Sequence, residues 1–187
     1  GQSLQNILAN KIEEMRQTVS LFDEKQLETI LNKIQHAGMV QFVAVGNTIP
    51  VALDGAYKLN EIGIPSMAGT IWETQLSFAM TLKKKDVQIA ISNSGESKQV
   101  VKMVRAAKKN GCTTVGITNN PNSTIAKEVD YHIQTATREK LFMNEFCFSR
   151  VSAMTVIEIL YLFLTVGQAQ SYARLSECEN LMADEKV

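Results

Sequence analysis

The chain has 187 residues, 45% of them hydrophobic, and its 19 lysines and arginines equal its 19 aspartates and glutamates in number. This length and apolar content suffice for one domain with a sizeable core, and they exclude a disordered chain. A net charge of zero argues against nucleic-acid binding by this segment, because a polyanion is held by an excess of positive charge.

Residues 1–37 are predicted to form two helices that pack on the rest of the domain. Apolar residues recur there at spacings of three and four, and a break at Phe22-Asp23-Glu24 separates a second helix that is capped by Asp23. The segment is amphipathic and of mixed charge, unlike a secretory leader. We therefore expect a cytoplasmic protein.

From residue 38 onward strands and helices alternate. Short strands are predicted at residues 41–45, 64–68, 87–91, 113–117 and 131–134, and helices at 50–62, 70–82, 96–110 and 123–128. Such an alternation implies right-handed crossovers and a parallel sheet with helices on both faces. We therefore predict an α/β fold with five parallel strands, in the flavodoxin-like order 2-1-3-4-5, and helical extensions at the N- and C-terminal ends.

The turn after the third strand is the most informative segment. Residues 89–97 read Ile-Ala-Ile-Ser-Asn-Ser-Gly-Glu-Ser, so an apolar strand runs into a hydroxyl-rich turn just before a helix. Hydroxyls and amides at a helix N-terminus suit a phosphate monoester. The loop after the first strand is also small and polar, and with this strand order the two loops meet where ligands bind. The predicted phosphosugar-binding residues are Gly46, Asn47, Thr48, Ser92, Asn93, Ser94, Gly95, Glu96 and Ser97.

Two simpler interpretations apply to parts of this pattern. Ser, Asn and Gly are ordinary N-cap residues, so the turn alone is also explained as a helix cap. Glu96 is interpreted as a first-turn carboxylate that complements the dipole of the helix at 96–110. Three scattered cysteines and two histidines predict neither a disulfide framework nor a metal site, so we expect no metal and no cofactor.

A long helix is predicted over residues 144–167, followed by an amphipathic segment at 169–187. Its most apolar stretch, 159–166, is expected to be a buried helix and not a membrane anchor, because Arg150 and Glu158 keep it below the roughly 20 residues that span a bilayer. The helix is apolar on nearly every side, more than one sheet face buries. We therefore expect a partner subunit on this helix, most simply in a two-fold dimer.

The segment Ile91-Ser92-Asn93-Ser94-Gly95-Glu96-Ser97 resembles the Ser-x-Ser-Gly-Glu-Thr/Ser phosphosugar motif of the sugar isomerase (SIS) domain family. Three further segments narrow the resemblance to the C-terminal effector-binding domain of RpiR-type bacterial transcription regulators: Asp54-x-x-Tyr57-Lys58-Leu59-x-x-Ile62-Gly63, Gly116-Ile117-Thr118 and Ser149-Arg150-Val151. The resemblance implies a three-layer α/β/α sandwich, a homodimer or tetramer, and a sugar phosphate held by the hydroxyls of Ser92, Ser94, Ser97 and Thr48.

The same resemblance implies that residues 38–187 form the SIS domain, with residues 1–37 packed on it as part of a single domain. Regulators of this kind read DNA through an N-terminal helix-turn-helix domain, which we expect to be absent here, so DNA is a partner only through that domain. The family's first loop usually reads Gly-x-Gly-x-Ser, whereas this chain has Ala44-Val45-Gly46-Asn47-Thr48. Glu73 occupies a position where many relatives carry histidine. The candidates for the sugar end are Glu73, Glu145 and Arg150.

Three functions remain open at this point. The favoured one is a sugar-phosphate sensor attached to a DNA-binding domain. The alternative is an aldose-ketose isomerase such as a 6-phospho-3-hexuloisomerase, which needs a base to move a proton between adjacent carbons. The candidate bases Glu73, Glu96, Glu145 and His132 all have simpler structural interpretations, so we assign no catalytic residue. An oligomerisation module would explain the long helix but not the two polar loops.

Overall fold

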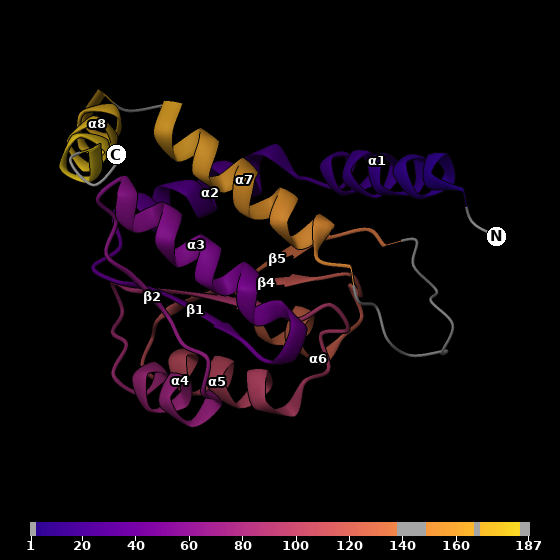
Figure 1. The fold of residues 1–187 in the computed structure, drawn as a ribbon. Helices are drawn as coiled ribbons and strands as arrows, with labels where there is room; N and C mark the ends of the chain where they lie inside the picture. Colours follow the sequence, from indigo (N-terminus) through magenta and orange to yellow (C-terminus); the bar gives the residue numbers. More distant parts are fainter. Residues whose placement is uncertain (1–2, 138–148, 167–168, 184–187) are drawn as a thin grey trace.

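The computed structural model describes residues 3–137, 149–166 and 169–183, and its centre is a sheet of five parallel strands (Figure 1). The strands lie in the predicted order β2-β1-β3-β4-β5, which is therefore confirmed. Their bounds are β1 Val40–Ala44, β2 Ser66–Ala68, β3 Val87–Ile91, β4 Thr113–Thr118 and β5 Tyr131–Gln134.

The register of β1 and β3 brings the two polar loops together. Val40 pairs with Val87 and Ala44 pairs with Ile91, so the two strands end at the same level. The loop after β1 and the turn after β3 therefore start side by side at the carboxyl edge of the sheet. In this strand order the edge between β1 and β3 is where the crossovers change direction, which is the usual ligand position in such sheets.

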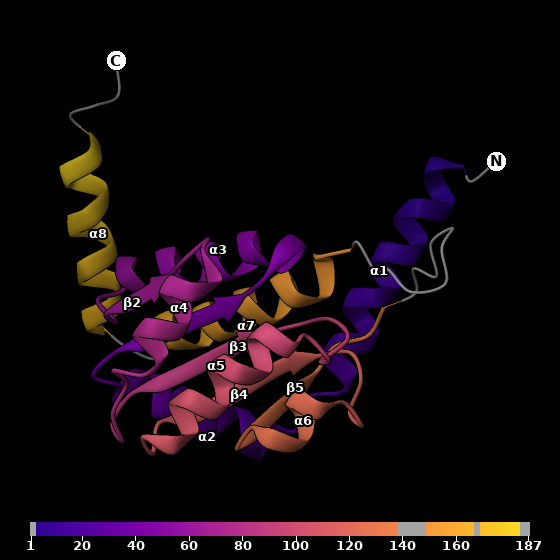
Figure 2. The same ribbon diagram turned by 90° about the horizontal axis from the view of Figure 1, so that it is seen from below.

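Helices cover both faces of the sheet and give three layers (Figures 1 and 2). One layer contains α2 Glu24–Gln35, α3 Ile49–Glu61 and α7 Val151–Val166, and the other contains α4 Trp72–Ala79, α5 Lys98–Lys109 and α6 Thr124–Glu128. Alternate strand residues point to opposite layers: Phe42 lies in the core with α2, α3 and α7, and Val43 in the core with α4 and α5. The predicted three-layer fold is confirmed.

Side-chain caps define where several helices begin. Asp23 accepts a hydrogen bond from the amide of Gln26, as predicted. Ser97 accepts one from the amide of Val100, so α5 begins at Lys98 and not at Glu96. The prediction that Glu96 lies in the first turn of this helix is therefore wrong, because the serine cap places it before the helix.

The first helix, α1 Leu4–Ser20, has an unusual orientation. Its fully buried residues are polar, namely Glu14 and Thr18, and α1 contacts α7. Its exposed apolar side chains are Leu4, Ile7, Leu8, Ile12, Met15 and Val19. The helix extends beyond the body of the domain at one end, and α8 Ala169–Ala183 lies at the other end (Figure 2).

The helix α7 is only partly enclosed. Val156, Ile157, Leu160 and Leu164 are buried, but Leu162, Phe163 and Val166 are 53%, 57% and 70% exposed. The described residues of this chain do not bury this face of α7, so the expected burial over 159–166 depends there on the predicted partner subunit. The partner subunit stays a prediction, and the predicted helical residues 144–148 lie outside the described part.

No single helix among the described residues is long and apolar enough to cross a membrane. The helices α7 and α8 reach the required length and apolar composition only when they are counted together.

Candidate functional site

Thr48 ties the first loop to the end of β3. The loop forms a short 3-10 helix, η1 Gly46–Thr48, and the Thr48 hydroxyl lies 3.0 Å from the carbonyl oxygen of Val45 and 3.3 Å from that of Ile91. Thr48 is buried, and its one hydroxyl hydrogen is directed to these carbonyls. In this structure Thr48 therefore holds the two loops together instead of offering a hydrogen to the space above them.

The serines of the turn are arranged differently. The amide of Gly95 donates to Ser92 Oγ at 3.2 Å, the amide of Glu96 donates to Ser94 Oγ at 3.2 Å, and Ser97 Oγ caps α5. In each of these bonds the hydroxyl oxygen is the acceptor. Each serine therefore keeps its own hydroxyl hydrogen to donate to a ligand. Ser92 is buried, Ser97 is half-buried and Ser94 is exposed, so the turn offers these donors over a range of depths.

Gly95 is required at the centre of the turn for two reasons. Its φ is +71°, which favours glycine, and a Cβ there would lie 2.5 Å from Ser123 Cβ. Its carbonyl accepts a hydrogen bond from the amide of Ile125 at 3.0 Å, so the turn packs directly on α6. Gly46 also has a positive φ, +61°, but no described atom lies within 4 Å of a Cβ built there. The first loop therefore has open space beside Gly46, whereas α6 closes the turn at Gly95.

Glu96 faces α6. Its carboxylate accepts hydrogen bonds from the Thr124 hydroxyl at 2.6 Å and from the Thr124 amide at 2.9 Å. These two bonds lower the pKa of Glu96 below its usual value. Glu96, a predicted phosphosugar contact, therefore binds Thr124, the first residue of α6. Its charge complements the N-terminus of α6 and not, as was expected, that of α5.

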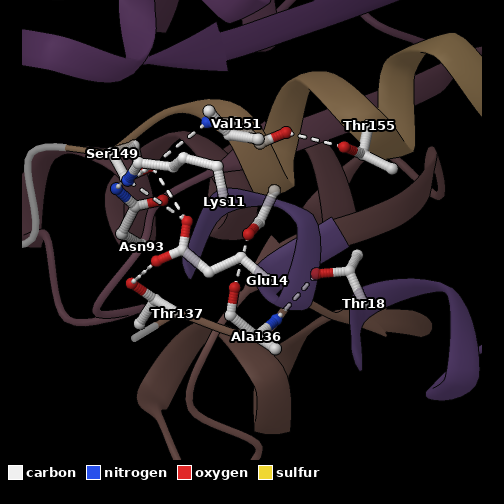
Figure 3. A network of polar contacts seen from close by, with 10 residues as sticks. Lys11, Glu14, Thr18, Asn93, Ala136, Thr137, Ser149, Val151 and Thr155 are labelled. Carbon is white, nitrogen blue, oxygen red and sulfur yellow. Dashed lines mark hydrogen bonds and ion pairs between the residues drawn. The ribbon is translucent and has the colours of Figure 1, made fainter. Parts of the chain in front are cut away.

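Asn93 faces the start of α7. Its side-chain Nδ2 donates to the main-chain carbonyl oxygen of Ser149 at 3.4 Å, and its main-chain carbonyl oxygen accepts a hydrogen bond from the amide of Asn119 at 2.9 Å. Ser149 in turn contacts two residues of α1, Lys11 and Glu14 (Figure 3). Asn47, the remaining predicted residue of the first loop, is half-buried.

The predicted sugar-end candidates come from different sides of the sheet. Glu73 is exposed in the first turn of α4, and Arg150 is exposed immediately before α7. These two helices belong to opposite layers, so the two side chains could approach a common ligand only across the strand ends. Glu145 lies outside the described residues.

Two other reactive side chains have structural surroundings. His132 Nε2 lies 2.8 Å from the Thr118 hydroxyl, and burial lowers the pKa of the imidazole. Cys112 is buried, and this burial raises the pKa of its thiol to about 12, so the thiolate is scarce at neutral pH. Within the described ranges no group of three or more His, Cys, Asp or Glu residues is placed to hold a metal ion.

The sequence did not single out the contacts of α1. Lys11, Glu14 and Thr137 join the neighbourhood of the turn only through folding, because Glu14 is 135 residues from Ser149 in the chain. The neighbouring Glu13 pairs with Arg16 on the surface. No signal in the sequence separated Glu14 from Glu13.

A comparison with known families decides the classification. The family model described as the SIS domain matches residues 33–163. The chain belongs to the SIS domain family. The turn Ser92-Asn93-Ser94-Gly95-Glu96-Ser97 lies within the matched residues of this SIS domain.

A curated relative of this SIS domain is an HTH-type transcriptional regulator of Caldanaerobacter subterraneus subsp. tengcongensis, 30% identical over 160 residues. The match covers 86% of this chain, and the chain spans 57% of the length of that relative.

Solved structures share the fold. The Vibrio vulnificus NanR protein, complexed with ManNAc-6P, superposes with a TM-score of 0.88 at 22% identity, covering 96% of this chain and 68% of that one. The sugar isomerase domain of an RpiR transcription factor from Sphaerobacter thermophilus gives 0.86 at 24% identity, covering 96% and 99%. A Bacteroides fragilis protein described as a phosphosugar isomerase has the same fold, with a TM-score of 0.76 at 21% identity over 92% and 94% of the two chains.

Proposed function

We propose that this SIS domain binds a sugar phosphate at the turn after β3 and is the effector domain of an RpiR-type transcriptional regulator. The observation that carries the proposal is the orientation of three serines, Ser92, Ser94 and Ser97, whose oxygens accept backbone amides. Their hydroxyl hydrogens remain to be donated at the N-terminus of α5. The relative described as an HTH-type transcriptional regulator supports a role in transcription regulation. In this proposal DNA is contacted by a helix-turn-helix domain and not by the SIS domain.

The strength of such a site is adequate for a metabolite sensor. Hydrogen bonds to a charged group contribute about 1.5–3 kcal/mol each, and a helix N-terminus adds about 0.3–2 kcal/mol. Three hydroxyls and the end of α5 therefore approach the roughly 8 kcal/mol of micromolar binding, before ordering costs are subtracted. A dianionic phosphate ester gains more from these donors than a neutral sugar does.

A phosphosugar isomerase is the second candidate, because proteins described in that way share the fold. Such an enzyme needs a free base near the substrate. Of the candidate bases that the structure describes, Glu96 is engaged by Thr124, His132 contacts Thr118, and Glu73 is exposed to solvent. These contacts favour the sensor over the isomerase. Turnover of a ketose phosphate that is lost in a Glu73→Gln or a Glu145→Gln variant would reverse this preference.

We also propose that the domain works as a homodimer or tetramer. The exposed apolar residues of α7, Leu162, Phe163 and Val166, and the apolar stripe of α1 have no cover within the described residues of one chain. Patches of this kind on two helices support an association between copies.

Calorimetric titration with a panel of hexose and pentose phosphates tests the ligand. We expect one of them to bind more tightly than inorganic phosphate, and Ser92→Ala and Ser94→Ala each to weaken that binding by about 10- to 150-fold, the loss of one charge-assisted hydrogen bond. Ser66→Ala is the control, since Ser66 begins β2 at the opposite edge of the sheet, where its hydroxyl donates to Ile64. A panel that binds no better than inorganic phosphate, or unchanged affinity in both turn variants, contradicts the proposal.

A further inference from the structure

Glu14 is a fully buried carboxylate in a helix that otherwise exposes its apolar side. A buried carboxylate is unfavourable unless it is paired and hydrogen-bonded. Glu14 contacts Lys11 Nζ at 3.3 Å, Ser149 Oγ at 3.4 Å and Thr137 Oγ1 at 3.5 Å (Figure 3). Thr137 follows β5 and Ser149 precedes α7, so one carboxylate joins α1 to two segments at the carboxyl edge of the sheet.

The same contacts lead to the phosphosugar turn. Ser149 Oγ accepts a hydrogen bond from Lys11 Nζ at 3.1 Å, and the Ser149 carbonyl accepts one from Asn93 Nδ2 at 3.4 Å. Asn93 stands between Ser92 and Ser94 in the turn. A single residue, Ser149, therefore separates the buried carboxylate of α1 from a side chain of the turn.

The attachment of α1 to the domain depends on polar contacts. Besides Glu14, Thr18 is buried, and its Oγ1 accepts the amide of Ala136 at 3.0 Å. The large apolar side chains of α1 stay between 37% and 84% exposed, so they add only partial apolar burial to this attachment. Hydrogen bonds exchanged with water contribute less to stability than a buried apolar face would. The position of α1 is therefore sensitive to small changes at Ser149.

We propose that Glu14 is a positioning residue that couples the docking of α1 to occupancy of the phosphosugar turn. The inference rests on the proposed function. With α1 docked, Glu14 and Lys11 hold Ser149, and Ser149 holds Asn93, so the turn keeps the conformation in which its serine hydroxyls face a ligand. Holding the turn in this way lowers the ordering cost of binding. By linkage, a bound sugar phosphate stabilises docked α1 to the same extent.

The experiment compares Glu14→Gln with Glu13→Gln on the same helix. Glu13 pairs with the exposed Arg16, so its variant removes a carboxylate of α1 without reaching the turn. ManNAc-6P is the first probe, and it is replaced by another sugar phosphate of the panel if that one binds more tightly. Inorganic phosphate is the reference. Calorimetry measures the affinity, and hydrogen exchange measures protection of the α1 amides with and without the probe.

Glu14→Gln is expected to weaken probe binding by about five- to 150-fold, the range of ordinary coupling between sites, while Glu13→Gln changes it less than about twofold. The probe should slow exchange of the α1 amides in the wild type but not in Glu14→Gln. A purely structural role of Glu14 would not make α1 exchange depend on the ligand. Glu14→Gln combined with Ser149→Ala should weaken binding no more than the stronger single variant, because both break one link.

The possible failures are distinguishable. If the wild type binds no sugar phosphate better than inorganic phosphate, the proposed function fails and the coupling fails with it. If the wild type binds the probe but Glu14→Gln behaves as Glu13→Gln does, or α1 exchange ignores the probe, only the coupling is overturned. Should Glu14→Gln not fold, Ser149→Ala removes the link from the side of α7, and the same outcomes decide.

Discussion

Replacing Gly95 by alanine is expected to destabilise the domain more than the same replacement at Gly46. Both glycines have positive φ, +71° and +61°, where a residue with a Cβ is strained by about 1–2 kcal/mol. The surroundings differ. At Gly46 the new methyl meets no described atom within 4 Å, whereas at Gly95 it would lie 2.5 Å from Ser123 Cβ and closer still to Ser123 Oγ.

These geometries set the expected magnitudes. Gly46→Ala should lower the free energy of unfolding by the strain alone, about 1–2 kcal/mol. Gly95→Ala adds an overpacking penalty of about 1–3 kcal/mol, for a total loss of about 2–5 kcal/mol. Adding Ser123→Gly to Gly95→Ala removes the obstructing side chain and should recover most of the stability that overpacking costs. Ser123 also caps α6 through the amide of Ala126, but a serine-to-glycine change at a cap loses only a few tenths of a kcal/mol.

Urea unfolding followed by circular dichroism measures these differences. The slope of free energy against urea should stay constant among the variants, so that midpoint shifts report stability. Ser123→Gly alone serves as the matched control for the lost cap. Equal losses for Gly46→Ala and Gly95→Ala, or a double variant no more stable than Gly95→Ala, would refute the packing of the turn against α6.

Three further outcomes are expected. Burial lowers the pKa of His132, so the imidazole is protonated more readily in the unfolded chain than in the folded one. The contribution of neutral His132 to stability is therefore complete above the unfolded pKa near 6.5 and is lost as the pH falls toward the lower folded pKa. His132→Gln should flatten the profile of unfolding free energy against pH below pH 6.5. Phe163→Glu puts a charge on the exposed face of α7 and should shift the protein toward monomer in sedimentation equilibrium, whereas an unchanged mass contradicts an interface there. Lys58→Met leaves Asp54 and Glu158, each 2.9 Å from Lys58 Nζ, without this cation and should lower the unfolding free energy by roughly 1–2 kcal/mol, as measured in urea.

Much of the fold follows from local patterns. The alternation of short strands and helices was enough to predict a parallel sheet, and the flavodoxin-like order 2-1-3-4-5 then gave the edge at which Ser92 and Thr48 meet. The start of α2 was predicted correctly from its Asp23 cap. The start of α5 was placed too early, since Glu96 and Ser97 both suit a first turn and only the bond from the amide of Val100 to Ser97 distinguishes them.

The exposure of α7 was harder to predict. Periodicity reports how apolar a segment is, and residues 159–166 are apolar all round. It does not report which side meets the sheet, so the sequence predicted an uncovered face on this helix and only the fold showed that Leu162, Phe163 and Val166 form it.

The amino-acid sequence by itself determined the order of the elements along the chain and the hydroxyl-rich turn that follows β3, because both depend on neighbours along the chain. Tertiary structure alone decided that Glu96 faces Thr124, that Thr48 donates to backbone carbonyls, and that Glu14 is buried beside Ser149. Each of these contacts joins residues of different elements, and the partner of a polar side chain is set by how those elements pack.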